Sequence, residues 1–366
     1  MTPEQTARAN ALTAEPSRDA AGDPARLARV ERTRTEMMAQ GSAIARTLAA
    51  EAPAIERLAA ALRERGVARV VVAGCGDSWH VGAGVRHAFE SLLGIPLEAA
   101  QALDYASYGV AAADARTLVI GISASGTTPV IMDALERARM RGAFTLGVSN
   151  TPGSALLTAF DDGLVVHATR SGWPTQSSTA TMALLMRLAQ RWADTPEAER
   201  FGADLDAIAS RLDGLAIALD APVAALATTV ADAPLVLFAG LGPNMATACF
   251  GAAKVKELSP VHAIATPLEE YHHYRSQKAG EPLVLVATDA ASLERALDTA
   301  LVSRKVGGRL IAILALAHAA IEELAFGVVQ VPAVRPELAA LPAGIPMHLF
   351  AYHFAKQRDA LGLGAA

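Results

Sequence analysis

The sequence predicts an α/β protein of two doubly wound parallel-sheet units in tandem, each a three-layer αβα arrangement with helices on both faces of its sheet. The first observation is a set of continuously apolar runs, such as residues 70–74 and 118–122, which do not alternate and are typical of strands buried on both faces. These runs alternate with helical patterns, which indicates right-handed crossovers between parallel strands. A new cycle of strand, glycine turn and helix begins at Leu235, so the chain is interpreted as an internal duplication.

Each half of the chain supplies its own series of strands. In the first half we expect strands at 69–74, 97–102, 117–122, 143–149 and 163–167, with helices at 78–93, 128–141 and 177–193. In the second half we expect strands from 235 and at 260–265, 282–287, 308–314 and 327–331, with a closing helix at 338–361. We predict a disordered tail at 1–26, a first unit with N-terminal helices at 27–230 and a second unit at 231–366, because the tail has no apolar periodicity and Pro234 punctuates the chain.

Composition narrows the possible partners and location. The net charge is −5 and is spread along the chain, so there is no basic stripe of the kind that binds nucleic acid. The two cysteines, Cys75 and Cys249, imply no disulfide framework, which fits a reducing cytosol. The N-terminus has no cationic start followed by an apolar block, and no run of eighteen apolar residues follows. We therefore expect a cytoplasmic protein with no membrane or nucleic-acid partner.

Two predicted strands of the first unit end in small, hydroxylated turns that lead directly into helices. The first turn is Gly74-Cys75-Gly76-Asp77-Ser78 and the second is Ser123-Ala124-Ser125-Gly126-Thr127-Thr128. Backbone N–H groups and hydroxyls at a helix N-terminus can hold a tetrahedral anion, and neighbouring strand ends of an open sheet border one crevice. One such turn alone is more often a plain helix cap. The two in order indicate a phosphate pocket, and hence a phosphorylated small molecule as the ligand.

These turns do not match the better-known phosphate loops. The chain has no G-x-x-x-x-G-K-[ST] motif, and Gly76 is not followed by the third glycine of a dinucleotide fingerprint. The second turn instead resembles the Ser-x-Ser-Gly-x-Thr of the sugar isomerase (SIS) fold, which grips a sugar phosphate, and the first resembles the Gly-Cys-Gly-Thr-Ser that precedes it. The resemblance implies as substrate- or phosphate-binding residues Gly76, Asp77, Ser78, Ser123, Ser125, Gly126 and Thr128, together with Gln176 and Ser177.

The second half carries the candidate catalytic residues. Lys254 and Glu257 are three apart in a helical pattern that ends near Pro260, so they share a helix face. Such a pair is commonly a solvent-exposed ion pair that contributes little to stability. Lys256 is expected to be an exposed lysine of that ordinary kind. Here, however, the helix ends beside a strand terminus, where an open sheet places its ligand.

The same region resembles the double-SIS family, which includes the isomerase domain of glucosamine-6-phosphate synthases and related deglycases. The resemblance is without gaps from Gly251 to His273 and returns at 346–353. It implies that Glu257 is the base that moves a proton between C1 and C2 through an enediol, that His273 opens the sugar ring, and that Lys254 assists proton movement at the hydroxyls. It also implies a homodimer in which His273 reaches the site from the partner subunit. Because the resemblance accounts for the histidines, we expect neither a metal nor another cofactor.

Departures from the family pattern concern the far end of the pocket. Ala124 replaces a glutamine between the two serines, Phe250 replaces a glutamate, and the segment 170–179 differs from the family's Glu-x-x-Val-Ala-Ser-Thr-Lys. In that segment Arg170 and Trp173 could shape a pocket for an acidic or bulky substituent, or could lie on a surface loop. No glutaminase domain precedes the first unit, so we expect that this chain does not draw ammonia from glutamine by itself.

We therefore predict an aldose–ketose isomerase that acts on a phosphorylated sugar or aminosugar. Three alternatives stay open: a deglycase or deaminase that uses Glu257 and His273 to expel an amine, a phosphosugar-binding regulator without catalysis, and a pocket that takes a sulfonate in place of phosphate. Retention of Glu257, Lys254 and His273 together weighs against the regulator, since phosphate binding needs only the first half.

Overall fold

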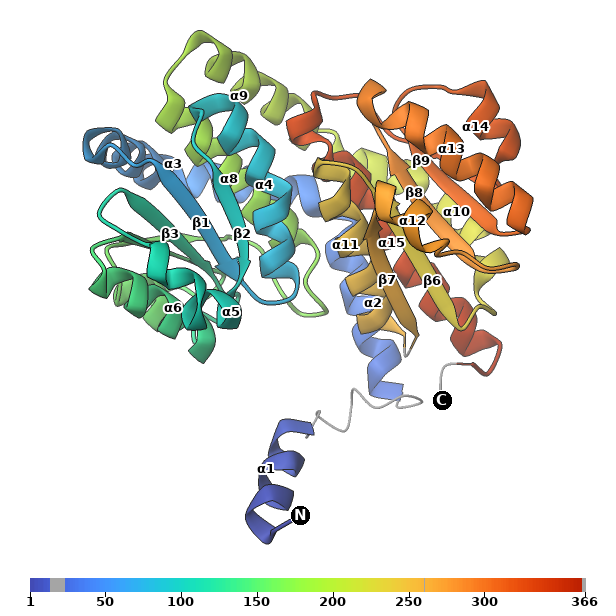
Figure 1. The fold of residues 1–366 in the computed structure, drawn as a ribbon, viewed down its shortest axis with the longest axis horizontal. Coiled ribbons are helices and arrows are strands. Elements are labelled where there is room, and N and C mark those ends of the chain that lie inside the picture. Colours follow the sequence, from blue (N-terminus) through green and yellow to red (C-terminus); the bar gives the residue numbers. More distant parts are fainter. Residues whose placement is uncertain (14–23, 260, 364–366) are drawn as a thin grey trace.

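The computed structural model describes residues 1–13, 24–259 and 261–363, and it contains two sheets of five parallel strands (Figure 1). The first sheet has the order β2-β1-β3-β4-β5 and the second, from its opposite edge, β7-β6-β8-β9-β10. The first comprises β1 (Arg69–Gly74), β2 (Leu97–Gln101), β3 (Thr117–Ile122), β4 (Phe144–Ser149) and β5 (Asp162–Val165). The second comprises β6 (Leu235–Gly240), β7 (His262–Pro267), β8 (Pro282–Ala287), β9 (Arg309–Leu314) and β10 (Gly327–Gln330). All eight strand pairings are parallel, which confirms the predicted tandem α/β fold.

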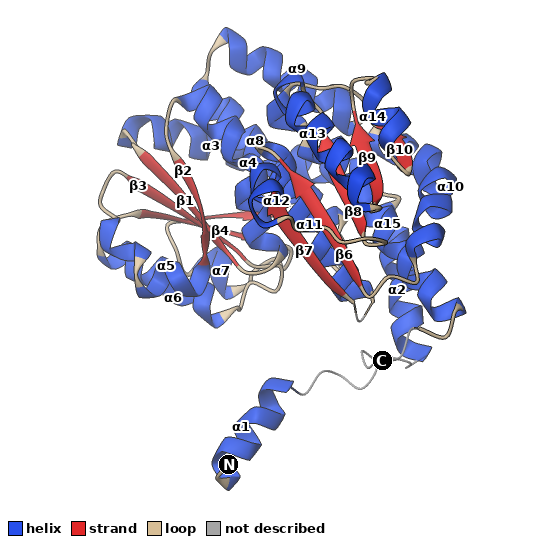
Figure 2. Cartoon of the chain, turned by 45° about the vertical axis from the view of Figure 1, so that its right-hand side comes forward, coloured by secondary structure: helices blue, strands red, loops and turns tan. Residues whose placement is uncertain are grey.

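Helices cover both faces of each sheet, as Figure 2 shows. Those up to the end of the first unit are α1 (Pro3–Thr13), α2 (Pro24–Met37), α3 (Gln40–Arg65), α4 (Asp77–Leu93), α5 (Ala102–Ser107), α6 (Pro129–Met140), α7 (Ala155–Thr158), α8 (Gln176–Ala193) and α9 (Pro196–Ala209). Those that follow are α10 (Leu212–Val230), α11 (Pro243–Leu258), α12 (Leu268–Tyr274), α13 (Ala290–Val306), α14 (Ala319–Leu324) and α15 (Ala340–Ala360). Short 3₁₀ turns lie at Gly109–Ala112 and Pro336–Leu338.

The apolar runs of the sequence are continuous because alternate residues of a strand enter different cores. In β1, Val70 and Val72 enter a core shared by both units, whereas Val71 and Ala73 enter one beneath α5 and α6. The shared core runs through α4 and α8 of the first unit and α11 and α15 of the second. The two sheets are therefore joined through one continuous apolar interior, with α4 and α11 packed together between them (Figure 1).

The two units repeat the same strand-to-helix turn in detail. Gly76 and Gly242 precede their helices with φ of +56° and +57°, a conformation that side chains rarely adopt. A Cβ atom on Gly74 or on Gly240 would lie 2.5 Å from a backbone carbon of the following helix. Glycine is therefore required at each of these positions, and the duplication seen weakly in the sequence is a duplication of turn geometry.

In the expected disordered tail at 1–26, residues 24–26 begin α2 and residues 3–13 form helix α1. The helix begins with a reciprocal capping box: the Thr2 N–H donates to Gln5 Oε1 at 2.7 Å, and the Gln5 N–H donates to Thr2 Oγ1 at 3.1 Å. Pro3 occupies the first helical position, where its missing N–H is harmless. Residues 14–23 of the expected tail, and Pro260 at the expected start of a strand, lie outside the described residues.

Helix α10 packs chiefly along α15 and only slightly against α3, so it lies on the second unit. By this packing the boundary between the two units would lie before α10. The boundary near residue 231 that the sequence suggested stays a prediction. In the described part of the chain α10 alone is long and apolar enough to cross a membrane. One such helix is weak evidence for a membrane span. Two carboxylates of α10 are engaged within the protein: Asp213 accepts from Gly41 and Ser42 of α3, and Asp220 pairs with Arg34 and His353. Cytoplasmic location stays a prediction.

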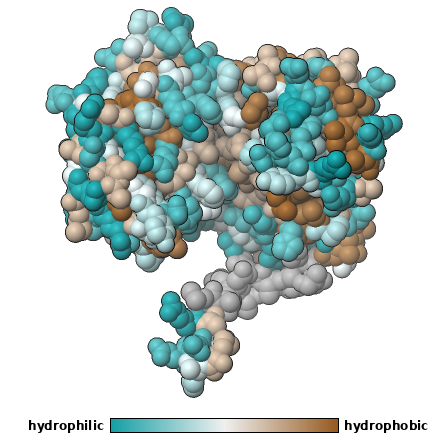
Figure 3. Space-filling view, in the orientation of Figure 1, coloured by the Kyte–Doolittle hydropathy of each residue, from teal (hydrophilic) through white to brown (hydrophobic). Residues whose placement is uncertain are grey.

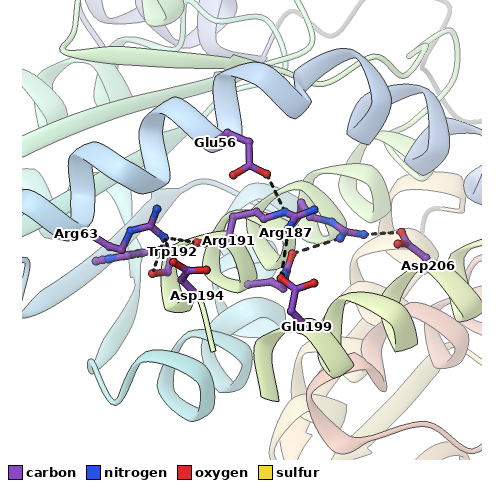
Figure 4. A network of polar contacts seen from close by, with 9 residues as sticks. Glu56, Arg63, Arg187, Arg191, Trp192, Asp194, Glu199 and Asp206 are labelled. Carbon is purple, nitrogen blue, oxygen red and sulfur yellow. Dashed lines mark hydrogen bonds and ion pairs between the residues drawn. The ribbon is translucent and has the colours of Figure 1, made fainter. Parts of the chain in front are cut away.

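Helix α8 is anchored at its C-terminal half by a polar network with α3 and α9 (Figure 4). Arg191 pairs with Glu56 at 2.9 Å and with Glu199 at 3.3 Å, and Arg187 pairs with Asp206. Exposed pairs of this kind contribute about 0–1 kcal/mol each, so their role is orientation more than stability. On the face shown in Figure 3, hydrophilic residues are interspersed with separate groups of apolar residues.

Candidate functional site

A cavity of about 250 Å³ lies at the C-terminal ends of β1 and β3, where α4 and α6 begin. This is the edge at which open parallel sheets bind their ligands. The predicted binding residues that line the cavity are Gly76, Asp77, Ser78, Ser123, Ser125, Thr128 and Ser177. Sequence reasoning missed further lining residues, which include Asn150, Ser178 and Thr181. Asn150 follows β4, and Ser178 and Thr181 lie in the largely buried helix α8. No local motif distinguishes these three residues from ordinary loop or buried helix residues.

Hydroxyl groups converge on one wall of the cavity. Ser123 Oγ lies 2.7 Å from Thr128 Oγ1 and 3.3 Å from Ser125 Oγ, and it accepts from the Gly126 N–H at 3.1 Å. Each hydroxyl can rotate to donate to an anion. Gly126 does not line the cavity but shapes the turn: its φ is +67°, and a Cβ there would lie 2.0 Å from Ser154 Oγ. The wall suits a tetrahedral anion at the start of α6.

A carboxylate from the second unit closes the same cavity. Glu257, in the last turn of α11, is among its lining residues, and its side chain keeps 30% exposure. Lys254 is fully buried on the same helix and pairs with Glu257. The Lys254 Nζ also lies 2.7 Å from Asp77 Oδ2, which accepts from Ser178 Oγ at 3.2 Å. The Asp77–Lys254–Glu257 chain therefore joins α4 of the first unit to α11 of the second at the cavity.

Burial determines the electrostatics of this chain. Burial raises the pKa of Glu257 to about 7; the Asp77 charge adds to the rise and Lys254 opposes it. Burial alone would lower the pKa of Lys254, but Asp77 and Glu257 outweigh it and raise that pKa. Lys254 is therefore a permanent cation, and Glu257 exchanges its proton near neutral pH, as a general base or acid must.

His348 on α15 is a buried polar residue to which sequence reasoning assigned no role. Neither ring nitrogen has a hydrogen-bond partner in the described part of the chain, and the same holds for Asp77 Oδ1. Burial lowers the pKa of His348 to about 3, with the Lys254 charge acting in the same direction, so the ring is neutral. The available signal was one histidine inside the otherwise apolar stretch 345–351.

Two predicted site residues lie elsewhere. Gln176 is buried, and its amide nitrogen donates to the carbonyl (3.2 Å) and hydroxyl (2.5 Å) of Thr169, so it supports the loop beside the cavity. His273 lies on α12 with 64% of its side chain exposed, outside the cavity lining of its own chain. Its nearest charged partner is Glu269, at 3.9 Å. Within the described ranges no cluster of three or more His, Cys, Asp or Glu side chains is arranged to hold a metal.

The equivalent position in the second unit is closed by its own side chains. Asn244 occupies the place of Ser78, and Thr288 follows β8 as Ser123 follows β3. The Asn244 amide donates to Thr288 Oγ1 at 2.9 Å, and the Thr288 hydroxyl lies 3.0 Å from Asn244 Oδ1. These polar groups satisfy each other, so the duplicated turns differ: the first unit has a hydroxyl-lined cavity, and the second contributes Glu257 to that same cavity.

Comparison with known proteins agrees with this arrangement. The SIS domain pattern matches residues 63–191, which hold β1 to β5 and both hydroxylated turns. The chain therefore contains an SIS domain. The SIS match covers the sheet of the first unit, and the second sheet has the same strand order.

Relatives of this SIS protein include isomerizing enzymes. It is 33% identical over 308 residues to glutamine–fructose-6-phosphate aminotransferase (isomerizing) of Thermus thermophilus. The aligned region covers 81% of this chain and 51% of the relative. The chain thus spans about half the length of the curated relatives that it matches. Its fold is similar to the C-terminal domain of glucosamine-fructose-6-phosphate aminotransferase from Francisella tularensis (TM-score 0.75, 21% identity, 89% of this chain and 96% of that one). It is also similar to tagatose-6-phosphate ketose/aldose isomerase from Escherichia coli (TM-score 0.73, 19% identity, 91% and 94%).

Proposed function

We propose that this SIS protein is an aldose–ketose isomerase of a phosphorylated sugar or aminosugar. The observation that carries the proposal is that Glu257, a carboxylate with a pKa of about 7, lines the same cavity as the hydroxyls of the Ser123–Thr128 turn. An anion site and a proton-transfer group in one cavity are what the isomerisation of a phosphosugar needs.

In this reaction the hydroxyl wall holds the phosphate, and the ionised Glu257 takes the proton from C2 of the open-chain aldose. The electron pair forms the C1=C2 bond of an enediol as the carbonyl oxygen at C1 gains a proton. Glu257 then returns its proton to C1 while the C2 hydroxyl loses its own, which gives the ketose. Lys254 keeps the Glu257 carboxylate in place and stays charged throughout.

The proposal is tested by incubating the protein in D₂O with hexose 6-phosphates, aminohexose 6-phosphates and amine adducts of fructose 6-phosphate, with proton NMR as the readout. We expect interconversion of one aldose–ketose pair with deuterium appearing at the exchanged carbon, because an enediol shares its proton with solvent. Amine release without interconversion would instead establish a deglycase or deaminase, and binding without either would establish a regulator. A sulfonate analogue in the same panel shows whether the anion site discriminates by charge.

We also propose that His273 opens the ring across a homodimer interface, which accounts for its exposure away from its own cavity. Glu257→Gln and His273→Ala should each be inactive, whereas their mixture should regain about a quarter of wild-type activity. Random exchange makes about half of the dimers mixed, and each mixed dimer has one intact site of two. Activity is measured after mixing and subunit exchange.

His272→Ala is the matched control for the complementation experiment, because its ring Nε2 lies 2.9 Å from Thr299 Oγ1 within its own chain. It should retain activity without mixing. A fully active monomer, or mixtures that stay inactive although mixed dimers form, would contradict the assignment of His273 to the partner's site.

A further inference from the structure

One cation in the cavity wall has no role in the chemistry described above. Arg170 lies in the loop between β5 and α8, is exposed, and lines the cavity together with Glu257. The charge of Lys254 is matched by Asp77 and Glu257. Arg170, in contrast, has no hydrogen bond or ion pair to another described residue, so its guanidinium is available to a ligand in the cavity.

The loop that carries Arg170 is held in place on both sides of that residue. Glu36 of α2, only 3% exposed, accepts from Thr169 Oγ1 at 2.8 Å, from Ser171 N and Oγ at 2.7 and 3.1 Å, and from Gly172 N at 3.2 Å. A buried carboxylate needs such bonds to offset its lost hydration. Gly172 packs so closely on α2 that a Cβ there would lie 2.2 Å from Thr33 Oγ1. The residues on both sides of Arg170 are therefore tied to α2, which fixes where its backbone lies beside the cavity.

Two further arginines, Arg26 and Arg29, lie against Trp173 of the same loop. The Arg29 guanidinium lies 4.1 Å, and that of Arg26 5.4 Å, from the centre of the Trp173 ring, three residues after Arg170. Arg26 also donates to the Glu257 carbonyl oxygen at 2.7 Å, which ties α2 to the catalytic helix. Trp173, Arg26 and Arg29 do not line the cavity, so among its lining residues Arg170 is the cation that can meet an anion on the ligand.

The anion at Arg170 is not required to be the phosphate. The hydroxyl wall follows β3, whereas the Arg170 loop follows β5, and β4 lies between them. Two strand spacings are roughly 10 Å, about the distance from a sugar's phosphate to a substituent at its opposite end. A guanidinium also matches the planar, two-oxygen geometry of a carboxylate.

We propose that Arg170 forms a subsite for a carboxylate, so that the substrates of this protein are phosphosugars that carry an acidic substituent, with Glu36 as its positioning residue. The inference rests on the proposed function, since it names the substrate class of the same cavity. It extends that function from a phosphosugar in general to one with two anionic ends.

The test compares three ligands by calorimetry: glucosamine 6-phosphate, the glycine adduct of fructose 6-phosphate, and the corresponding glycinamide adduct, which lacks the carboxylate. Arg170→Met should weaken the glycine adduct about tenfold to a hundredfold more than the glycinamide adduct, because one charged hydrogen-bonding pair is lost. Glu36→Gln should lower the same glycine-to-glycinamide preference to a smaller degree, which a general loss of folding would not do. Ser125→Ala is the matched control and should weaken all three ligands alike, by about tenfold or more.

Equal loss of all three ligands in Arg170→Met would assign Arg170 to the phosphate grip and overturn the inference, and so would an unchanged preference. Either result leaves the isomerase proposal intact if wild-type protein interconverts an aldose–ketose pair in the NMR panel. Wild-type protein that binds none of the phosphorylated ligands would overturn the proposed function and the inference together.

Discussion

Glu257→Gln should fold normally and still bind its phosphosugar, while turnover falls by at least about a hundredfold. The amide keeps the shape of the cavity wall but cannot accept the proton from carbon. In the wild-type protein, activity should rise with pH through about 7, because the base must be ionised and its pKa is raised to about 7. The variant should lose this rising limb. Turnover is measured by NMR on the pair that the panel identifies, across pH 5–9.

Glu270→Gln is the control for this experiment. Glu270 is half-buried on α12, near in sequence but outside the cavity lining, so its variant should keep the rate and pH profile of the wild type. Near-normal turnover in Glu257→Gln would move the base role to another group, and Glu270 would be examined first.

Lys254→Met should lower the free energy of unfolding by about 3–5 kcal/mol, because it leaves the partly or fully buried carboxylates of Asp77 and Glu257 without their cation. It should also move the active pH range upward. The Lys254 charge lowers the pKa of Glu257, so its removal raises that pKa further above the usual value for glutamate. The loss of stability should grow as pH rises through the folded-state pKa of Glu257, since only the ionised carboxylate needs the cation.

Urea unfolding at pH 6 and pH 8 measures this effect, with Lys256→Met as the matched control. Lys256 lies two residues away on α11 but is exposed, so its loss should change stability by less than about 0.5 kcal/mol. Adding Asp77→Asn to Lys254→Met should recover part of the stability, because one unpaired charge is removed. Equal effects of the two lysine variants would show that the Lys254 pair is energetically a surface pair.

Local pattern was sufficient for the strands and for the cluster of hydroxyl groups. The run from Val70 to Gly74 is apolar throughout because both of its faces are buried, and this is visible without knowing the partners. The hydroxyl wall was also local, since Ser123, Ser125 and Thr128 belong to one turn whose geometry depends on Gly126. The capping box at Thr2 and Gln5 is equally local, although the composition of this segment alone favours disorder.

The active constellation was decided by tertiary structure. Lys254 and Glu257, three apart on a helix, have the same spacing as a solvent-exposed pair, and only the packing of α11 against α4 removes water and brings Asp77 to 2.7 Å from the lysine. The isolation of His348 has the same origin. Gln176 was expected in the site but turns toward Thr169, because a side chain at a helix start can face either neighbour.

The sequence by itself therefore determined the α/β units, their glycine turns and the hydroxyl wall, because each depends on residues close together in the chain. Tertiary structure decided that Glu257 lines the same cavity as that wall and that burial raises the pKa of this carboxylate. It also decided that α2 holds the loop of Arg170 at the cavity, through the bond from Ser171 to Glu36. Periodicity records that a residue is buried but not against what. The proposed proton-transfer site depends on contacts between residues more than a hundred positions apart, and such contacts exist only once the two sheets share a core.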